Sequence, residues 1–208
     1  MQYKCALTIA GSDSVGGAGV QADIKTMSAL GVYAASAITA ITVQNTCGVY
    51  DIESLRPEIV GGQIRAVMSD INPVAVKIGM VNDAATIHAI ADALKEYPTT
   101  AVIIDPVMVS TSGYRLMQED ALCIFHNELM PLASLLTPNV PEAEILADMK
   151  INNVDDMDRA ASIICQEANC DVLIKGGHLE GDTKTDILYH DSKRVAKYEA
   201  KTVDTRNT

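Results

Sequence analysis

Charged or polar residues follow three of the strands that this sequence predicts. The strands, each with the residues that follow it, are Ala101–Ile104 with Asp105, Ser134–Leu136 with Thr137, Asn139 and Glu142, and Asp171–Ile174 with Lys175. In an open α/β sheet, ligands bind beyond the carboxyl ends of the strands, so we expect these side chains to share one site. Any one of them is explained equally well as a helix cap, but three strand ends together favour a binding site.

The residue types at these strand ends suit phosphoryl transfer, which depends on positioning and on neutralising charge. Asp105 and Glu142 offer carboxylate oxygens, which Mg²⁺ accepts as ligands while it keeps several waters. The amide of Asn139 can hold a phosphate oxygen or a metal-bound water. Lys175 supplies a movable positive charge for the phosphates of ATP, and we expect it to be a catalytic residue. ATP and Mg²⁺ are therefore the predicted cofactors.

A glycine-rich turn lies between a predicted strand at Cys5–Ala10 and a predicted helix at Gly19–Leu30. Its glycines are Gly11, Gly16, Gly17 and Gly19. Glycine lets the backbone approach a ligand closely and adopt positive φ. The unpaired N–H groups at the start of the following helix suit an anionic or polar ligand. This order of elements predicts the first unit of a nucleotide- or metabolite-binding α/β domain, although a tight turn without a ligand would give the same pattern.

The segment Gly17–Ala22 also fits the dinucleotide-binding pattern G-x-G-x-x-G/A. That pattern begins where the strand ends, whereas here residues 11–16 intervene. The second strand of a dinucleotide-binding unit ends in an acidic residue that binds ribose, and here the polar residues are Gln44 and Asn45. We therefore disfavour a dinucleotide as the ligand.

Six blocks of sequence carry a more specific signal. They are A-G-S-D-S-V-G-G-A-G-V-Q-A-D-I-K-T at Ala10–Thr26, A-I-T-A-I-T-V-Q-N-T-C-G-V at Ala37–Val49, K-I-G-M at Lys77–Met80, D-P-V-M at Asp105–Met108, T-P-N-V-P-E at Thr137–Glu142 and K-G-G-H at Lys175–His178. In this order, and over nearly the whole chain, the blocks resemble the hydroxymethylpyrimidine/phosphomethylpyrimidine kinases. That family belongs to the ribokinase-like superfamily and serves thiamine biosynthesis.

The resemblance implies ATP-dependent phosphorylation of 4-amino-5-hydroxymethyl-2-methylpyrimidine and then of its monophosphate. It implies that this pyrimidine binds against Gln44, Asp23 and Gly11, with Met80 and Val107 as apolar walls. The Gln44 amide suits an aminopyrimidine edge because it offers both a donor and an acceptor, and Asp23 can accept from a hydroxyl or an amine. Ordinary core packing explains Met80 and Val107 equally well.

The resemblance also assigns Asn139, Glu142 and Lys175 to the nucleotide side, in agreement with the strand-end argument. A pyridoxal-type kinase is an alternative, because pyridoxal also presents a hydroxymethyl group on a six-membered nitrogen ring. Relatives in this family commonly form homodimers, so a homodimer is expected here as well.

The sequence departs from the family pattern near its C-terminus. Members of the family carry a segment similar to T-x-N-T-H-G-T-G-C, whose glycines form an anion hole and whose Cys takes the proton of the substrate hydroxyl. Here residues 203–208 read V-D-T-R-N-T, and the proton acceptor would lie beyond Thr208. We therefore expect the 208-residue chain to have little kinase activity by itself, and a pyrimidine-binding protein without catalysis is an alternative. Neither His178 nor Cys47 is assigned as the catalytic base.

Length and charge limit the classes of protein that this chain can represent. The 208 residues predict one ribokinase-like domain over residues 1–208 that ends before the anion-hole helix. A net charge of −11 argues against a nucleic-acid partner, since the phosphate backbone requires a basic face. The five cysteines have no C-x-x-C pair and no metal-ligand spacing, which predicts reduced thiols and a cytoplasmic location.

One uncharged stretch, from Thr26 to Tyr50, is long enough to span a membrane. It contains Gly31, Gln44 and Asn45 together with many small residues. A helix end, a turn and a strand buried on both faces explain this composition better than a membrane span.

Apolar runs alternate with amphipathic stretches along the rest of the chain. The further predicted strands are Ala35–Val43 and Val74–Ile78, and the predicted helices are Pro57–Ile71, Asp83–Lys95, Glu119–Met130, Pro141–Ala147 and Asp155–Glu167. Two final strands, Thr185–Tyr189 and Arg194–Val203, flank the turn H-D-S-K. The alternation predicts an α/β fold with a mostly parallel central sheet, helices on both faces and a C-terminal antiparallel ribbon.

Overall fold

The computed structural model arranges the eight predicted strands and one further strand in a nine-stranded sheet, and it describes residues 4–98, 101–108, 117–179 and 181–203. The strands are β1 (Cys5–Ser12), β2 (Tyr33–Asn45), β3 (Gly48–Ser54), β4 (Ala75–Ile78), β5 (Val102–Ile104), β6 (Leu135–Leu136), β7 (Asp171–Ile174), β8 (Thr183–His190) and β9 (Lys193–Lys201). The helices are α1 (Gly19–Ala29), α2 (Pro57–Asp70), α3 (Ala84–Glu96), α4 (Glu119–Ile124), α5 (Val140–Leu146) and α6 (Val154–Ala168).

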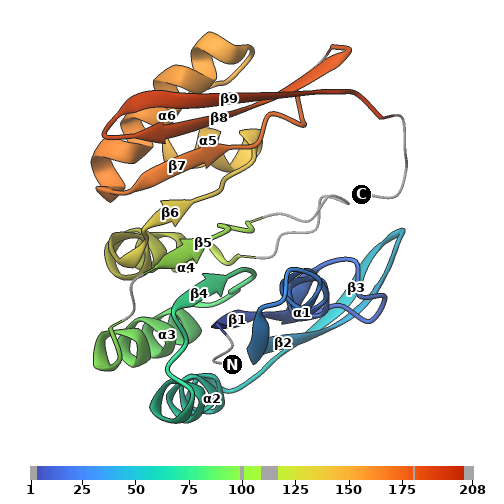
Figure 1. Cartoon of the computed structure of the whole chain (residues 1–208), viewed down its shortest axis with the longest axis vertical. Helices are drawn as coiled ribbons and strands as arrows, with labels where there is room; N and C mark the ends of the chain where they lie inside the picture. Colours follow the sequence, from blue (N-terminus) through green and yellow to red (C-terminus); the bar gives the residue numbers. More distant parts are fainter. Residues whose placement is uncertain (1–3, 99–100, 109–116, 180, 204–208) are drawn as a thin grey trace.

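The strand order is β3-β2-β1-β4-β5-β6-β7-β8-β9, and it reverses between β1 and β4. The six strands from β2 to β7 are parallel, whereas β3, β8 and β9 pair antiparallel. Because parallel crossovers are right-handed, this reversal places α1 on one face of the sheet and the later helices on the other. Figure 1 shows this arrangement, with α2, α3 and α4 along one side of the sheet and α1 on the other. The predicted fold class is confirmed.

Burial alternates along the central strands, so each strand has two different faces. In β4, Val76 and Ile78 are completely buried, whereas Ala75 and Lys77 are half-buried. Val76 and Ile78 therefore point to one face of the sheet, and Ala75 and Lys77 point to the other. This second face is the one that α1 covers, since Lys77 contacts Asp23 in α1. The period of two therefore places a lysine under α1, close to the carboxyl ends of the strands.

Two elements differ from the sequence-based prediction. β2 continues to Asn45 and pairs with β3, which the sequence analysis did not predict, through a two-residue loop at Thr46 and Cys47. This loop lacks the Asn-Gly or Asp-Gly pair that usually marks a hairpin. The single helix predicted over residues 119–130 is instead α4 followed by a π turn at Phe125–Leu129 and a 3₁₀ turn.

The C-terminal ribbon was predicted correctly. His190 pairs with Lys193, and Asp191 and Ser192 both have positive φ, as a two-residue type I′ turn requires. The uncharged stretch from Thr26 to Tyr50 is the end of α1, β2 and the start of β3. No helix in the described ranges has both the length and the apolar character needed to cross a membrane.

The start of α1 touches the end of β1 at a glycine. Gly19 has a φ of +58°, and a Cβ at this position would lie 2.3 Å from the carbonyl oxygen of Gly11. Because that neighbour is backbone, it cannot move aside cheaply. Gly31, just after α1, also has positive φ (+74°), but a Cβ there would meet no atom within 4 Å.

These two glycines separate backbone strain from steric clash. Gly31→Ala should cost about 1 kcal/mol of unfolding free energy, the usual penalty of positive φ for alanine. Gly19→Ala should cost about 1–3 kcal/mol more, because it adds an overpacked contact to the same strain. Urea unfolding of the two variants measures the difference. Equal losses of unfolding free energy would show that the close contact between Gly19 and Gly11 does not add to the cost of Gly19→Ala.

Candidate active site

One cavity of about 730 Å³ lies at the carboxyl ends of the parallel strands. All nine residues that the sequence analysis assigned to substrate, nucleotide or metal line it: Gly11, Asp23, Gln44, Met80, Asp105, Val107, Asn139, Glu142 and Lys175. They come from β1, α1, β2, the ends of β4 and β5, the start of α5 and the end of β7. The structure thus brings together residues separated by more than a hundred positions, while their individual roles remain predictions.

An ion pair dominates the end of the cavity near β5 and β7. Lys175 Nζ lies 2.6 Å from Asp105 Oδ1, and the Thr137 hydroxyl donates to the same oxygen at 3.3 Å. Asn139 forms a parallel bridge with Lys175, so the residues after β6 and β7 lie side by side. Both members of the ion pair remain partly exposed to the cavity, with 27% of Asp105 and 38% of the Lys175 side chain accessible.

Asn139 and Glu142 form the N-terminal capping box of α5. The Asn139 side chain accepts from the Glu142 N–H at 3.0 Å, and Glu142 Oε2 accepts from the Asn139 N–H at 2.8 Å. Glu142 is only 3% exposed. Burial raises the pKa of its carboxyl, and hydrogen bonds from backbone N–H groups and the charge of Lys175 only partly oppose this shift.

The two predicted metal ligands differ in how freely they can bind a cation. Asp105 uses Oδ1 for Lys175 and Thr137, and no described residue donates to its Oδ2. Glu142 is buried and engaged by the backbone. Across the described ranges, no group of three or more His, Cys, Asp or Glu residues is arranged to hold a metal. The donor set still fits Mg²⁺, which takes one or two carboxylates and completes its shell with water and phosphate oxygens.

The other end of the cavity lies between β1 and β2. Gln44 is half-buried, just past a register shift in β2, and its Oε1 is 3.2 Å from the Thr42 hydroxyl. Met80 lies against Gly11, where a Cβ would come within 2.5 Å of the methionine Cε. Met80 therefore packs on the glycine and also lines the cavity, while its role as a wall for the substrate stays a prediction.

Asp23 is held by two residues that the sequence analysis did not single out. Its Oδ2 accepts from the Thr8 hydroxyl at 2.5 Å and from Lys77 Nζ at 2.9 Å. Lys77 lines the cavity with Asp23, whereas Thr8 is completely buried beneath it. One signal was available in the sequence, since Lys77 interrupts the apolar strand β4.

The glycine-rich turn is held by the chain itself. Asp13, which is 4% exposed, accepts from the N–H groups of Val15, Gly17 and Ala18 at 2.8–3.0 Å. Its carboxylate therefore lies just before α1, where the sequence analysis expected an external anion. These three amides belong to the turn and the N-cap, so the expectation for the N–H groups of the first turn of α1 stays a prediction. The turn nevertheless lines the cavity through its backbone.

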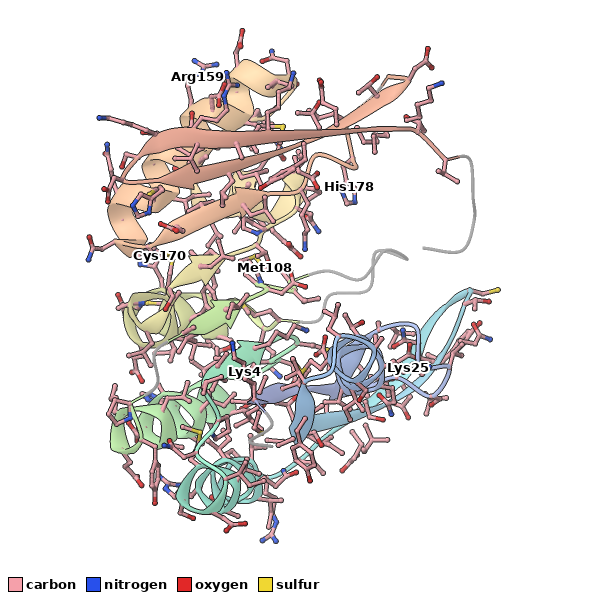
Figure 2. The ribbon with its side chains drawn as sticks, viewed as in Figure 1. Lys4, Lys25, Met108, Arg159, Cys170 and His178 are labelled. Carbon is pink, nitrogen blue, oxygen red and sulfur yellow. The ribbon has the colours of Figure 1, made fainter. Side chains whose placement is uncertain are left out.

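The remaining candidates lie at or outside the rim. His178 is exposed, in the loop between β7 and β8, and is absent from the cavity lining (Figure 2). Cys47 is exposed in the β2–β3 loop and lines the mouth. Residues 204–208, which carry most of the departure from the family segment, lie outside the described residues.

Comparison with known proteins gives one consistent result. A family model described as phosphomethylpyrimidine kinase matches residues 13–208. The hydroxymethylpyrimidine/phosphomethylpyrimidine kinase of Rhizobium meliloti is 50% identical over 203 residues, which are 97% of this chain and 76% of that protein. The thiamine biosynthetic bifunctional enzyme of Arabidopsis thaliana is 42% identical over 97% of this chain but only 39% of its own length.

Solved structures show the same relationship. The phosphomethylpyrimidine kinase of Clostridium difficile superposes with a TM-score of 0.85 at 49% identity, covering 96% of this chain and 84% of that one. An ADP complex of Bacillus subtilis pyridoxal kinase gives a TM-score of 0.88 at 34% identity, covering 98% and 77%. The backbone is therefore shared with pyridoxal kinases, while sequence identity is higher to the phosphomethylpyrimidine kinase.

Two glutamates of α5 should respond to pH in opposite directions. Burial raises the pKa of Glu142, so its contribution to stability is complete below its ordinary value of 4.5 and is lost as pH rises through the raised pKa. The Ile151 N–H and Lys150 lower the pKa of Glu144, so its contribution is present above 4.5 and is lost as pH falls.

Glu142→Gln should therefore become progressively more stable than the parent protein between about pH 4 and about pH 8. The neutral amide can still accept from the Asn139 N–H without the cost of burying a charge. Glu144→Gln is the matched control and should become relatively less stable over the same range. Urea unfolding at several pH values measures both differences, and parallel curves for Glu142→Gln and the parent would contradict the assignment.

Proposed function

This chain belongs to the phosphomethylpyrimidine kinase family, and from that premise we propose that it transfers the γ-phosphate of ATP to 4-amino-5-hydroxymethyl-2-methylpyrimidine and then to the resulting monophosphate, in thiamine biosynthesis. One observation carries the proposal. The residues expected to bind the pyrimidine and those expected to bind the nucleotide line opposite ends of a single cavity. A phosphoryl group can therefore pass between the two ligands without leaving it.

The pyrimidine lies, in this proposal, at the β1–β2 end. Gln44 pairs with the aminopyrimidine edge, because its amide can donate and accept in one plane. Asp23 accepts a hydrogen from an amine or hydroxyl of the ligand. The backbone at Gly11 and the side chains of Met80 and Val107 form the walls, and all three line the cavity.

The nucleotide phosphates lie at the β5–β7 end. Lys175, which is paired with Asp105 in this structure, turns to the phosphates, and Asp105 is then free to bind Mg²⁺. The ion supplies neutralisation of the triphosphate charge. Asn139 and Glu142 keep the start of α5 in place, and Glu142 would offer the ion a second carboxylate. The ADP complex of the pyridoxal kinase supports a nucleotide site in this fold.

A pyridoxal-type kinase is the second candidate, favoured by the close backbone match to a pyridoxal kinase. Competition between pyridoxal and the aminopyrimidine for one site distinguishes the two substrates. Inhibition of aminopyrimidine binding only at high pyridoxal concentration supports the main proposal, and tighter binding of pyridoxal overturns it.

We also propose that the protein is a cytoplasmic homodimer. All five cysteines are free thiols, as suits a reducing compartment. Apolar side chains on β2 and β3 are exposed, with Tyr33, Val43 and Tyr50 each more than half accessible. Sedimentation velocity tests the oligomeric state, and a monomer at all concentrations contradicts it.

Gln44→Leu should weaken binding of the aminopyrimidine about 5- to 150-fold. The leucine leaves ligand donors and acceptors unpaired, which costs roughly 1–3 kcal/mol. The fold should survive, because leucine is similar in size and Gln44 is only half-buried. Titration calorimetry measures the affinity, with Gln166→Leu on the exposed side of α6 as the control. An affinity unchanged within about twofold would exclude Gln44 as the residue that recognises the base.

Lys175→Ala should weaken binding of ATP about 10- to 150-fold and leave binding of the pyrimidine nearly unchanged. A hydrogen bond to a charged group contributes about 1.5–3 kcal/mol, and the variant leaves Asp105 without its cation beside the phosphates. Calorimetry with each ligand separately tests this, and Lys193→Ala at the start of β9 is the control. Equal loss for both ligands would contradict the placement of Lys175 at the nucleotide end.

A further inference from the structure

Three polar side chains from different elements meet at the point where the strand order reverses. Thr8 in β1 and Lys77 in β4 are direct cross-strand partners, so their side chains leave the sheet on the same face. Both donate to one oxygen of Asp23, in α1: the hydroxyl at 2.5 Å and the ammonium at 2.9 Å. We call these three residues the Asp23 triad.

The triad leaves one oxygen of Asp23 without a donor among the described residues. Asp23 Oδ2 already accepts from two donors, whereas no described residue donates to Oδ1. The side chains of Asp23 and Lys77 are 18% and 24% exposed, and both line the cavity. A carboxylate fixed through one oxygen presents the other in a defined direction.

The cavity is lined by two separate lysine–aspartate ion pairs, of which the triad contains one. Among the described lining residues, the two lysines are Lys77 and Lys175, and each is paired with an aspartate. The pair of Lys175 and Asp105 lies at the nucleotide end, and the pair of Lys77 and Asp23 lies under α1. The ammonium of Lys77 donates to Asp23, and this ion pair holds the carboxylate of Asp23 in place.

A purely structural role would be to tether α1 to the sheet. Apolar side chains perform such a task without the cost of removing two charges from water, and replacing a buried ion pair by packed apolar residues is often neutral or stabilising. The pair is also directed into the cavity rather than toward the core. Its position therefore favours a role in ligand recognition.

We propose that Lys77 is a positioning residue for the pyrimidine pocket, acting with Thr8 to orient Asp23 so that Oδ1 accepts an N–H or O–H of the ligand. This inference rests on the proposed function, because it assumes that the aminopyrimidine binds against Asp23. It assigns a role to two residues outside the nine predicted from the sequence. Lys77 acts through Asp23, and Thr8 has no access to the ligand at all.

The test is titration calorimetry of the protein with 4-amino-5-hydroxymethyl-2-methylpyrimidine and, separately, with ADP. Lys77→Met keeps the length of the side chain and removes its charge, and we expect about a tenfold loss of pyrimidine affinity with ADP affinity unchanged. In an Asp23→Asn background the same substitution should change pyrimidine affinity by less than about twofold. Lys150→Met, in an exposed ion pair outside the cavity, is the matched control.

Thr8→Val provides the second, independent measurement. Valine has nearly the shape of threonine and removes only the hydroxyl, and Thr8 is too deeply buried to touch a ligand. We expect a loss of pyrimidine affinity of about threefold in a folded protein, in the same direction as for Lys77→Met. This variant decides the question even where Lys77→Met does not fold.

The possible outcomes distinguish a failure of the proposed function from a failure of the role assigned to the Asp23 triad. If the parent protein binds ADP but not the pyrimidine, the proposed function fails. If the parent binds both and neither Lys77→Met nor Thr8→Val changes pyrimidine affinity, the proposed function stands and the Asp23 triad is only structural. An equal effect of Lys77→Met in the parent and in the Asp23→Asn background also overturns the inference, since Lys77 would then act independently of Asp23.

Discussion

The reversal of strand order between β1 and β4 is the constraint from which the site follows. Right-handed crossovers on either side of this point separate α1 from the other helices and leave an opening at the carboxyl ends of the strands, where the cavity lies. Every parallel strand ends at the edge of that opening, so a polar residue at a strand end is brought to the cavity by topology alone. The fold thereby places Gln44 and Lys175 on the same cavity, although they are far apart in the sequence.

Site residues that directly follow a strand could be predicted from the sequence. Residues whose role depends on a hydrogen bond to a group elsewhere in the fold could not. Asp105, Asn139 and Lys175 follow apolar runs and could be placed by counting. Asp13 could not, because its function in the turn depends on a backbone that folds back onto it. Thr8 is hidden for the same reason, since the cross-strand register that pairs it with Lys77 is a property of the sheet.

Missing turn chemistry explains the one strand that was not predicted. β3 follows a loop of Thr46 and Cys47, whose residue types do not mark a hairpin, so the pairing with β2 had no local signal. By contrast, the β8–β9 ribbon could be predicted because Asp191 and Ser192 are typical turn residues. Over residues 119–130 the apolar pattern predicted one continuous α-helix. The structure instead changes from an α-helix to a π turn and a 3₁₀ turn, which an apolar pattern cannot distinguish.

The Asp23 triad has a consequence for how sequences of this family can diverge. Its members are distant in the chain, and Thr8 and Lys77 both donate to one carboxylate oxygen of Asp23. Losing either donor leaves the other hydrogen bond in place, whereas losing Asp23 leaves both donors without their acceptor in a partly buried place. Changes at Asp23 are therefore disfavoured more strongly than changes at Thr8 or Lys77, and lineages that lack Asp23 should lack both donors as well.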